Sequence, residues 1–318
     1  MTHLPDATIE RLRLIAEHPD LSETRYEVVE LIGRGGMGVV YSALDRELGR
    51  LVALKVTGTA ASTPDMIARL RREARILARL EHPNIIPVHD VGLLPDGRTF
   101  YTMKLVRGRR LDEYVQTGRS LAERLQIFER ICDAVAFAHA HGVVHRDLKP
   151  PNVMVGAFGE VLILDWGIAK TDPDPGIDPS FPSAAGTIVG TQGFMSPEQA
   201  RGDPEVDART DIHALGVMLR FLVQGRYEAY PRDEGRRHPK RLAAIADRAT
   251  RLDPDDRYQS VPALAEDLAR YRDALPVEAY RENLAERLGR VAGRYRVPLA
   301  LVVAYMVMRL VLLLAVRK

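Results

Sequence analysis

Near the middle of the chain, eight consecutive residues bring together side chains that suit chemistry on a phosphate. They read His-Arg-Asp-Leu-Lys-Pro-Pro-Asn from position 145 to position 152. Asp147 could accept the proton of a substrate hydroxyl, and Asn152 could hold a magnesium ion against the oxygens of a nucleotide. Phosphoryl transfer needs both groups near one phosphate, and their short separation in the sequence allows this.

Four further motifs surround these eight residues. Upstream, a glycine-rich run at residues 33–38 lies between two apolar stretches, and Lys55 follows within the apolar run 51–56. Downstream come Asp165-Trp166-Gly167 and Ser196-Pro197-Glu198. The glycine-rich run alone would fit a dinucleotide-binding turn or an ordinary hairpin just as well. In this order, however, the five motifs resemble the bacterial serine/threonine protein kinases of the eukaryotic-like (Hanks) type.

This resemblance implies an α+β fold with two lobes over residues 24–275. A small β-rich N-lobe (24–105) would carry one helix, and a larger, mainly helical C-lobe (106–275) would follow. A chain of 318 residues, of which 46% are hydrophobic, can hold one such unit with short extensions. Residues 1–23 are expected to form a helical extension in front of the kinase domain.

The resemblance assigns catalytic roles to four residues: Lys55, Asp147, Lys149 and Thr191. Lys55 and Lys149 would neutralise charge on the phosphates, and Thr191 would hydrogen-bond near Asp147. Alternatively, Lys55 is a surface lysine, although a surface residue would be unusual in the middle of this apolar run.

Asn152 and Asp165 are expected to bind a metal ion. A short hairpin between them would place the two side chains next to each other, as two ligands of one ion must be. An aspartate before an aromatic residue and a glycine would otherwise be an ordinary turn. The cofactors implied by the resemblance are ATP and Mg²⁺, with Mn²⁺ as a substitute.

An expected helix from Pro64 to Leu80 carries Glu73 among several arginines. The resemblance implies that Glu73 pairs with Lys55 and holds it toward the phosphates. The alternative is an exposed ion pair with Arg69 or Arg72, which contributes only a few tenths of a kcal/mol.

The nucleotide is expected to lie between the glycine-rich run and the strand that leads into the C-lobe. Met103 would control access to the adenine pocket, and the backbone of Lys104 and Val106 would contact adenine. The full set expected around ATP is Ile32, Gly33, Arg34, Gly35, Gly36, Met37, Gly38, Val40, Ala53, Lys55, Glu73, Met103, Lys104, Val106 and Met154.

Residues 171–190, rich in Pro, Asp, Gly and Ser, are expected to form an activation loop. Because Arg146 precedes Asp147, the resemblance implies that a phosphate orders this loop. Thr187 is the first candidate for the modified residue and Ser183 the second. Alternatively, both are ordinary loop residues.

Three residues are assigned structural roles: Asp211 would anchor the backbone of the catalytic loop, and Glu198 would form a buried ion pair with Arg257.

Two positions depart from the family pattern. Trp166 replaces the usual phenylalanine, and Pro151 stands where many kinases that prefer basic substrates have a glutamate. The polar run 225–241 is also shorter than the helix found there in most family members.

The C-terminal residues differ in character from the rest. From residue 297 to 316 the only charge is Arg309, and 20 residues of helix reach about 30 Å, the thickness of a bilayer core. A basic juxtamembrane linker (276–296) precedes this segment, as expected on the cytoplasmic side. The segment is therefore expected to be a transmembrane helix that anchors a cytoplasmic kinase domain in the inner membrane. The alternative is an apolar helix packed on protein, which a charge at the centre favours.

The sequence thus predicts an active serine/threonine protein kinase in bacterial signal transduction that phosphorylates its own activation loop. Its expected partners are ATP, proteins with Ser or Thr, the membrane, and a second copy of the chain for phosphorylation in trans. A net charge of +2 implies no nucleic-acid partner, and the lone Cys132 excludes an intrachain disulfide.

Two alternative functions are a pseudokinase scaffold and a kinase of small molecules. The complete catalytic set argues against the first, and the Ser-Pro-Glu segment argues against the second.

Overall fold

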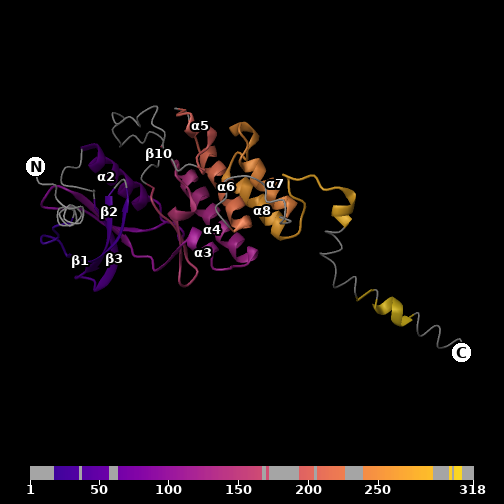
Figure 1. Ribbon diagram of the computed structural model, residues 1–318, viewed down its shortest axis with the longest axis horizontal. Helices are drawn as coiled ribbons and strands as arrows, with labels where there is room; N and C mark the ends of the chain where they lie inside the picture. Colours follow the sequence, from indigo (N-terminus) through magenta and orange to yellow (C-terminus); the bar gives the residue numbers. More distant parts are fainter. Residues whose placement is uncertain are drawn as a thin grey trace, which may run out of the picture.

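The computed structural model describes residues 18–35, 38–56, 64–166, 170–171, 193–203, 206–225, 239–288, 301–302 and 304–309. Within these ranges the chain forms a β-rich half and a helical half, which lie next to each other along the long axis in Figure 1. The expected two-lobed α+β fold is confirmed.

The β-rich half is an antiparallel sheet with the strand order β1-β2-β3-β5-β4. Successive residues of a strand face opposite sides of a sheet. On β5, Tyr101 lies in a core that includes Leu77 of helix α2, whereas Phe100 packs with Tyr26 in a second core. The elements of this half are β1 (Tyr26–Gly35), β2 (Gly38–Asp45), β3 (Arg50–Val56), α2 (Pro64–Arg79), β4 (Val88–Leu93) and β5 (Thr99–Lys104).

The helical half begins after β5 and contains two small sheets, with the orders β6-β8-β9 and β10-β7. Its strands are β6 (Gly108–Arg110), β7 (Val143–Val144), β8 (Val153–Gly156), β9 (Val161–Ile163) and β10 (Lys170–Thr171). Its helices are α3 (Leu111–Val115), α4 (Leu121–Ala140), η1 (Pro150–Asn152), α5 (Pro197–Ala200), α6 (Arg209–Gln224), α7 (Lys240–Ala249), η2 (Pro254–Asp256) and α8 (Val261–Arg272).

Helix α4 lies at the centre of this half and leads into the catalytic loop. It begins with a capping box, in which Ser120 Oγ accepts from the Glu123 N–H and the Glu123 carboxylate accepts from the Ser120 N–H. Phe128 and Ile131 are fully buried, and the helix packs against α6 and α8. Gly142 ends it with a φ of +71°, which glycine adopts without strain, and turns the chain into β7.

The two ends of the chain are described only in part. Of the helical extension expected over residues 1–23, the structure describes 18–23, which form no helix. Residues 301–302 and 304–309 are helical, and their large hydrophobic side chains are more than half exposed. In the described parts of the chain, no helix has the length and apolar character needed to cross a membrane. The remainder of the expected span (297–316) lies outside the described residues.

Candidate active site

Three elements meet at the ammonium group of Lys55. Strand β3 supplies Lys55, helix α2 supplies Glu73, and the segment after β9 supplies Asp165. Lys55 Nζ lies 2.9 Å from Glu73 Oε1, 3.1 Å from Glu73 Oε2 and 3.1 Å from Asp165 Oδ1. Lys55 and Glu73 are buried, whereas the Asp165 side chain is 56% exposed. The expected Lys55–Glu73 pair is therefore present, and it lies beside a carboxylate that solvent can reach.

The charges of this group support one another. Burial alone would lower the pKa of Lys55, but the carboxylates of Glu73 and Asp165 raise it well above its ordinary value. Partial burial would raise the pKa of Asp165, yet the Lys55 ammonium lowers it. The lysine therefore stays charged and Asp165 stays ionised, as a phosphate-binding cation and a metal ligand must be.

The sequence analysis missed one member of this group, Tyr101. Its hydroxyl donates to Glu73 Oε1 over 2.9 Å, and its ring lies 5.8 Å from Lys55 Nζ. Tyr101 is directly opposite Lys55 in the pairing of β5 with β3, so the two side chains share a face of the sheet. The sequence shows a tyrosine two residues before Met103, but only the register of β3 and β5 reveals that this tyrosine lies opposite Lys55.

The catalytic loop brings Asp147, Lys149 and Asn152 together. Lys149 Nζ donates to Asp147 Oδ2 over 2.7 Å. Asn152 Nδ2 donates to the main-chain oxygen of Asp147 over 2.8 Å and to its Oδ2 over 3.3 Å. The amide of Asn152 thus fixes the backbone of Asp147, while its own main-chain oxygen accepts from the N–H of Leu164 over 2.8 Å. This last bond places Asn152 next to Leu164, the residue before Asp165.

A buried carboxylate in helix α6 holds this loop from behind. Asp211 Oδ2 accepts from the His145 N–H and Oδ1 accepts from the Arg146 N–H, each over 2.8 Å. His139 Nε2 lies 2.8 Å from Oδ2 as well. Burial would raise the pKa of Asp211, but hydrogen bonding to His139 and the Arg146 N–H lowers it, so the anchor stays charged. Arg146 takes a φ of +69°, which costs energy in a residue other than glycine, and these bonds stabilise that conformation.

Trp166, which replaces the usual phenylalanine, is fully buried. Its ring centroid lies 4.7 Å from that of His145, so the indole packs directly against the catalytic loop. Among the described residues its Nε1 has no hydrogen-bond partner. The fold thus buries the larger ring completely, although the indole N–H gains no hydrogen bond there within the described ranges.

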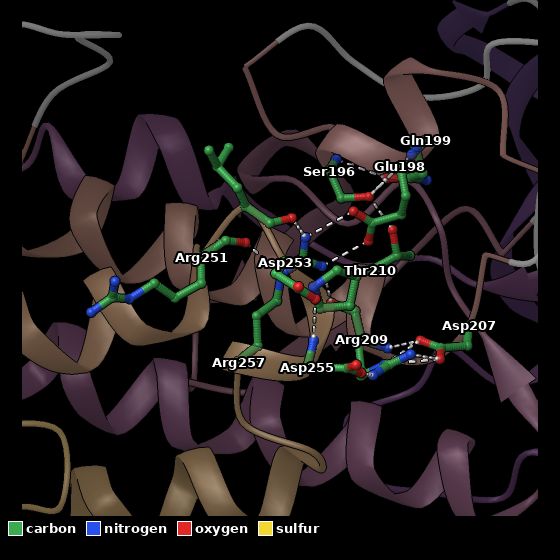
Figure 2. A network of polar contacts seen from close by, with 12 residues as sticks. Ser196, Glu198, Gln199, Asp207, Arg209, Thr210, Arg251, Asp253, Asp255 and Arg257 are labelled. Carbon is green, nitrogen blue, oxygen red and sulfur yellow. Dashed lines mark hydrogen bonds and ion pairs between the residues drawn. The ribbon is translucent and has the colours of Figure 1, made fainter.

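The ion pair expected between Glu198 and Arg257 is present, and it joins helix α5 to the residue that follows η2. Figure 2 shows the Arg257 guanidinium aimed at the Glu198 carboxylate, with nitrogen–oxygen distances of 2.7 and 2.8 Å. Burial would raise the pKa of Glu198, but the hydrogen bond from Arg257 lowers it to about 2. Gln199 next to it donates to the main-chain oxygen of Arg146 over 2.7 Å, a link that the sequence analysis did not foresee.

The residues expected around ATP that the structure describes lie on or next to strands of both halves and, for Glu73, on helix α2. Ile32, Gly33 and Arg34 belong to β1, Gly38 and Val40 to β2, and Ala53 faces Met103 across β3 and β5. Gly35 ends β1. Met154 lies on β8, and Lys104 ends β5 just before Val106. Gly36, Met37, Thr191, Ser183 and Thr187 lie outside the described residues, and the contacts of all these residues with a nucleotide remain predictions.

The donor set fits a magnesium ion. Asn152 and Asp165 offer an amide oxygen and a carboxylate, the hard ligands that Mg²⁺ prefers. In the described ranges no group of three or more His, Cys, Asp or Glu side chains could hold a metal. Two protein ligands suffice when phosphate oxygens and water complete the coordination, which is the usual arrangement for Mg²⁺ on a nucleotide.

Comparisons with known proteins agree with this geometry. A family model described as protein kinase domain matches residues 26–271. The serine/threonine-protein kinase PknD of Protochlamydia amoebophila is 33% identical over 293 residues, covering 77% of this chain and 30% of that protein. PknB of Mycolicibacterium smegmatis is 35% identical over 285 residues, covering 82% of this chain and 45% of that protein.

Among solved structures, the kinase domain of Mycobacterium tuberculosis PknI is similar to this chain. It has a TM-score of 0.59 and 26% sequence identity, covering 78% of this chain and 96% of the PknI chain. The chain spans about a third to a half of the length of the curated relatives it matches.

Proposed function

The chain belongs to the protein kinase family, and on that premise we propose that it transfers the γ-phosphate of ATP to serine and threonine hydroxyls of proteins. One observation carries this proposal. The Lys55 ammonium contacts both the buried Glu73 and the exposed Asp165, in a two-lobed fold whose catalytic loop presents Asp147 and Asn152. These groups can position a nucleotide and neutralise its charge, which is most of what phosphoryl transfer requires.

Each side chain has a defined task in this proposal. Asp147 accepts the hydroxyl proton, and Lys149, 2.7 Å from it, neutralises charge on the phosphate in transit. Lys55 binds the phosphates, and Asn152 and Asp165 hold the metal ion. Bound Mg²⁺, or Mn²⁺ in its place, would neutralise negative charge on the phosphate oxygens. Thr191 is assigned its bond near Asp147 from the family resemblance alone.

The test is incubation of the full chain with labelled ATP, Mg²⁺ and a general protein substrate, next to an Asp147→Asn control. Labelled phosphoserine or phosphothreonine, lost in the control, would support the function. Labelling that persists in the control or appears only on small molecules would contradict it. Removal of Mg²⁺ by EDTA should abolish transfer.

The domain limits and the regulation of the enzyme are also proposals. The kinase domain covers residues 24–275, divided after Leu105, and a second copy phosphorylates Thr187 in trans, with Ser183 as the next candidate. Thr187→Ala should lower activity toward an added substrate, because a phosphate there would order the loop. Unchanged turnover of that variant would refute this regulation.

The absence of a strong preference for basic substrates is proposed from Pro151. Because no carboxylate stands at this position, a substrate arginine would find no partner there. A peptide array should show no marked requirement for arginine. A strong arginine requirement would overturn this proposal.

The segment 297–316 is proposed to anchor the kinase in the inner membrane, with residues 276–296 as its basic linker. Supporting this, Leu301, Val302 and Met306 are more than half exposed, as expected of side chains that face lipid. The full chain should float with lipid vesicles in a density gradient, and Leu301→Arg/Met306→Arg should reduce this. Recovery of the unmodified chain without lipid would favour a helix packed on protein.

A further inference from the structure

The phenol of Tyr101 lies inside the ion pair of the small lobe. Tyr101 and Glu73 are each only 1% exposed, and the hydroxyl lies 2.9 Å from Glu73 Oε1. The position follows from the strand register, since Tyr101 is directly opposite Lys55 and faces helix α2, which carries Glu73. Most residues of this face are apolar, so a hydroxyl here has a specific partner rather than a general polar surrounding.

The Lys55 ammonium has three N–H donors, and the structure gives each of them an acceptor. Two point to the Glu73 carboxylate and one to Asp165 Oδ1, at 2.9 to 3.1 Å. A phosphate that binds Lys55 must take over at least one of these donors. If the ammonium turns so that a donor on Glu73 is taken as well, the buried carboxylate loses part of its compensation, which is costly for a buried charge. The bond from Tyr101 does not depend on Lys55.

We propose that Tyr101 is a positioning residue, whose hydroxyl keeps the Glu73 carboxylate facing Lys55 while the ammonium turns toward the phosphates of the nucleotide. This inference rests on the proposed kinase function and adds a residue to its machinery. Tyr101 acts through Glu73 and touches neither the nucleotide nor the substrate.

The protonation of the phenol agrees with this role. Burial raises the pKa of Tyr101, and Glu73 raises it further although Lys55 opposes the change, so that it lies well above its ordinary value. The hydroxyl therefore remains protonated, and so a donor, at neutral pH. A donor is what a carboxylate needs, because an ionised carboxylate only accepts hydrogen bonds.

The first test is Tyr101→Phe in the full chain. The kcat should fall about tenfold, because a hydrogen bond to a charged group contributes to the placement of Lys55, while the KM for ATP should change by less than about threefold. Tyr26→Phe is the matched control. Tyr26 is 2% exposed, lies on the other face of the same sheet and donates to Asp90 over 2.9 Å, so it loses a comparable bond without touching Glu73. Its kcat should stay within about twofold of the unmodified chain.

The second test separates positioning from general stability. In a Glu73→Gln background, adding Tyr101→Phe should lower kcat by less than about twofold, since the hydroxyl acts through the carboxylate. Independent, multiplicative losses would overturn the proposal, and so would a kcat of Tyr101→Phe equal to that of Tyr26→Phe. An unmodified chain that transfers no phosphate would instead refute the kinase function, and this inference with it.

Discussion

The molecule contains two buried ion pairs that look alike but differ in what surrounds them. In the β-rich half, Lys55 pairs with Glu73 at 2.9 Å, and in the helical half Arg257 pairs with Glu198 at 2.7 Å. Both cations are almost fully buried, with side chains 5% and 0% exposed. Distance and burial alone would assign the two pairs the same role.

The two ion pairs differ in the other hydrogen bonds that their cations make. All five N–H donors of Arg257 are used within the fold, on Glu198 and on the main-chain oxygens of Arg209, Arg251 and Leu252. Lys55 instead directs one donor to Asp165, which is 56% exposed. The arginine pair is closed and structural, whereas the lysine pair has a donor that a ligand can take over. A buried ion pair therefore indicates a binding site only where one of its bonds leads to solvent.

The largest expected effect is on stability, from breaking the closed pair. Arg257→Met should lower the free energy of unfolding by about 3–5 kcal/mol, because it leaves Glu198 charged and buried and three carbonyl groups without their donor. Chemical denaturation measures this. Arg251→Met is the control, since the Arg251 side chain is exposed and points away from the network in Figure 2. Equal losses of unfolding free energy in the two variants would show that the hydrogen bonds of the Arg257 side chain do not stabilise the fold as described.

Breaking the open pair should affect chemistry more than folding. Lys55→Met should lower kcat by about 10²–10³-fold, the usual effect of removing one charge-stabilising group. Its loss of stability should be smaller than that of Arg257→Met, because Glu73 keeps the hydrogen bond from Tyr101 and water can replace the missing donor at Asp165. Lys240→Met, which removes a 72% exposed lysine of α7, should leave kcat unchanged. Full activity of Lys55→Met would contradict the claim that the Lys55–Glu73 pair, unlike the Arg257–Glu198 pair, serves the chemistry.

Acid should weaken the closed pair in a defined range. Arg257 depresses the pKa of Glu198 from 4.5 to about 2, so the pair contributes its full stability above pH 4.5 and loses it as the pH falls toward 2. The contribution is about 3 kcal/mol. Urea denaturation between pH 7 and pH 3 should show a shallower decline for Glu198→Gln than for the unmodified chain. Parallel declines would show that Glu198 is not the group that titrates.

The smallest expected effect concerns the link between the two regions. Gln199→Leu removes the 2.7 Å bond to the Arg146 carbonyl, next to Asp147, and should lower kcat about fivefold at a cost in stability of about 1–2 kcal/mol. Gln259→Leu is the control, because Gln259 donates only to carbonyls of the Arg257 loop. It should change stability without changing kcat. The same kcat in both variants would show that the catalytic loop does not depend on Gln199.

Much of this architecture was predictable from the sequence. The resemblance predicted that Lys55 pairs with Glu73 and that Glu198 pairs with Arg257, and the structure contains both contacts. Motifs with fixed spacing also singled out Asp147 and Asn152, which a hydrogen bond joins. These contacts were predictable because each motif is local and its order along the chain determines the lobe that carries it.

The contacts of Tyr101 and Gln199 were not predictable in the same way. Tyr101 reaches Glu73 only because β5 pairs with β3 in one particular register, and a shift of one residue would turn its side chain to the opposite face. The sequence around Gln199 is typical of a helix cap, which explains its bonds to Ser196. Its hydrogen bond to the Arg146 carbonyl joins residues that are 53 positions apart. Such contacts depend on tertiary packing, which a single sequence does not specify locally.

Binding of ATP to the full chain, measured by calorimetry with Mg²⁺ and with EDTA, tests the central claim most directly. The account predicts that ATP binds more tightly with Mg²⁺, that Asp165→Asn removes this difference, and that Lys55→Met weakens binding in both conditions. Affinity that is independent of Mg²⁺ and of both substitutions would contradict the claim that the Lys55 cluster exchanges a partner for a metal-bound phosphate.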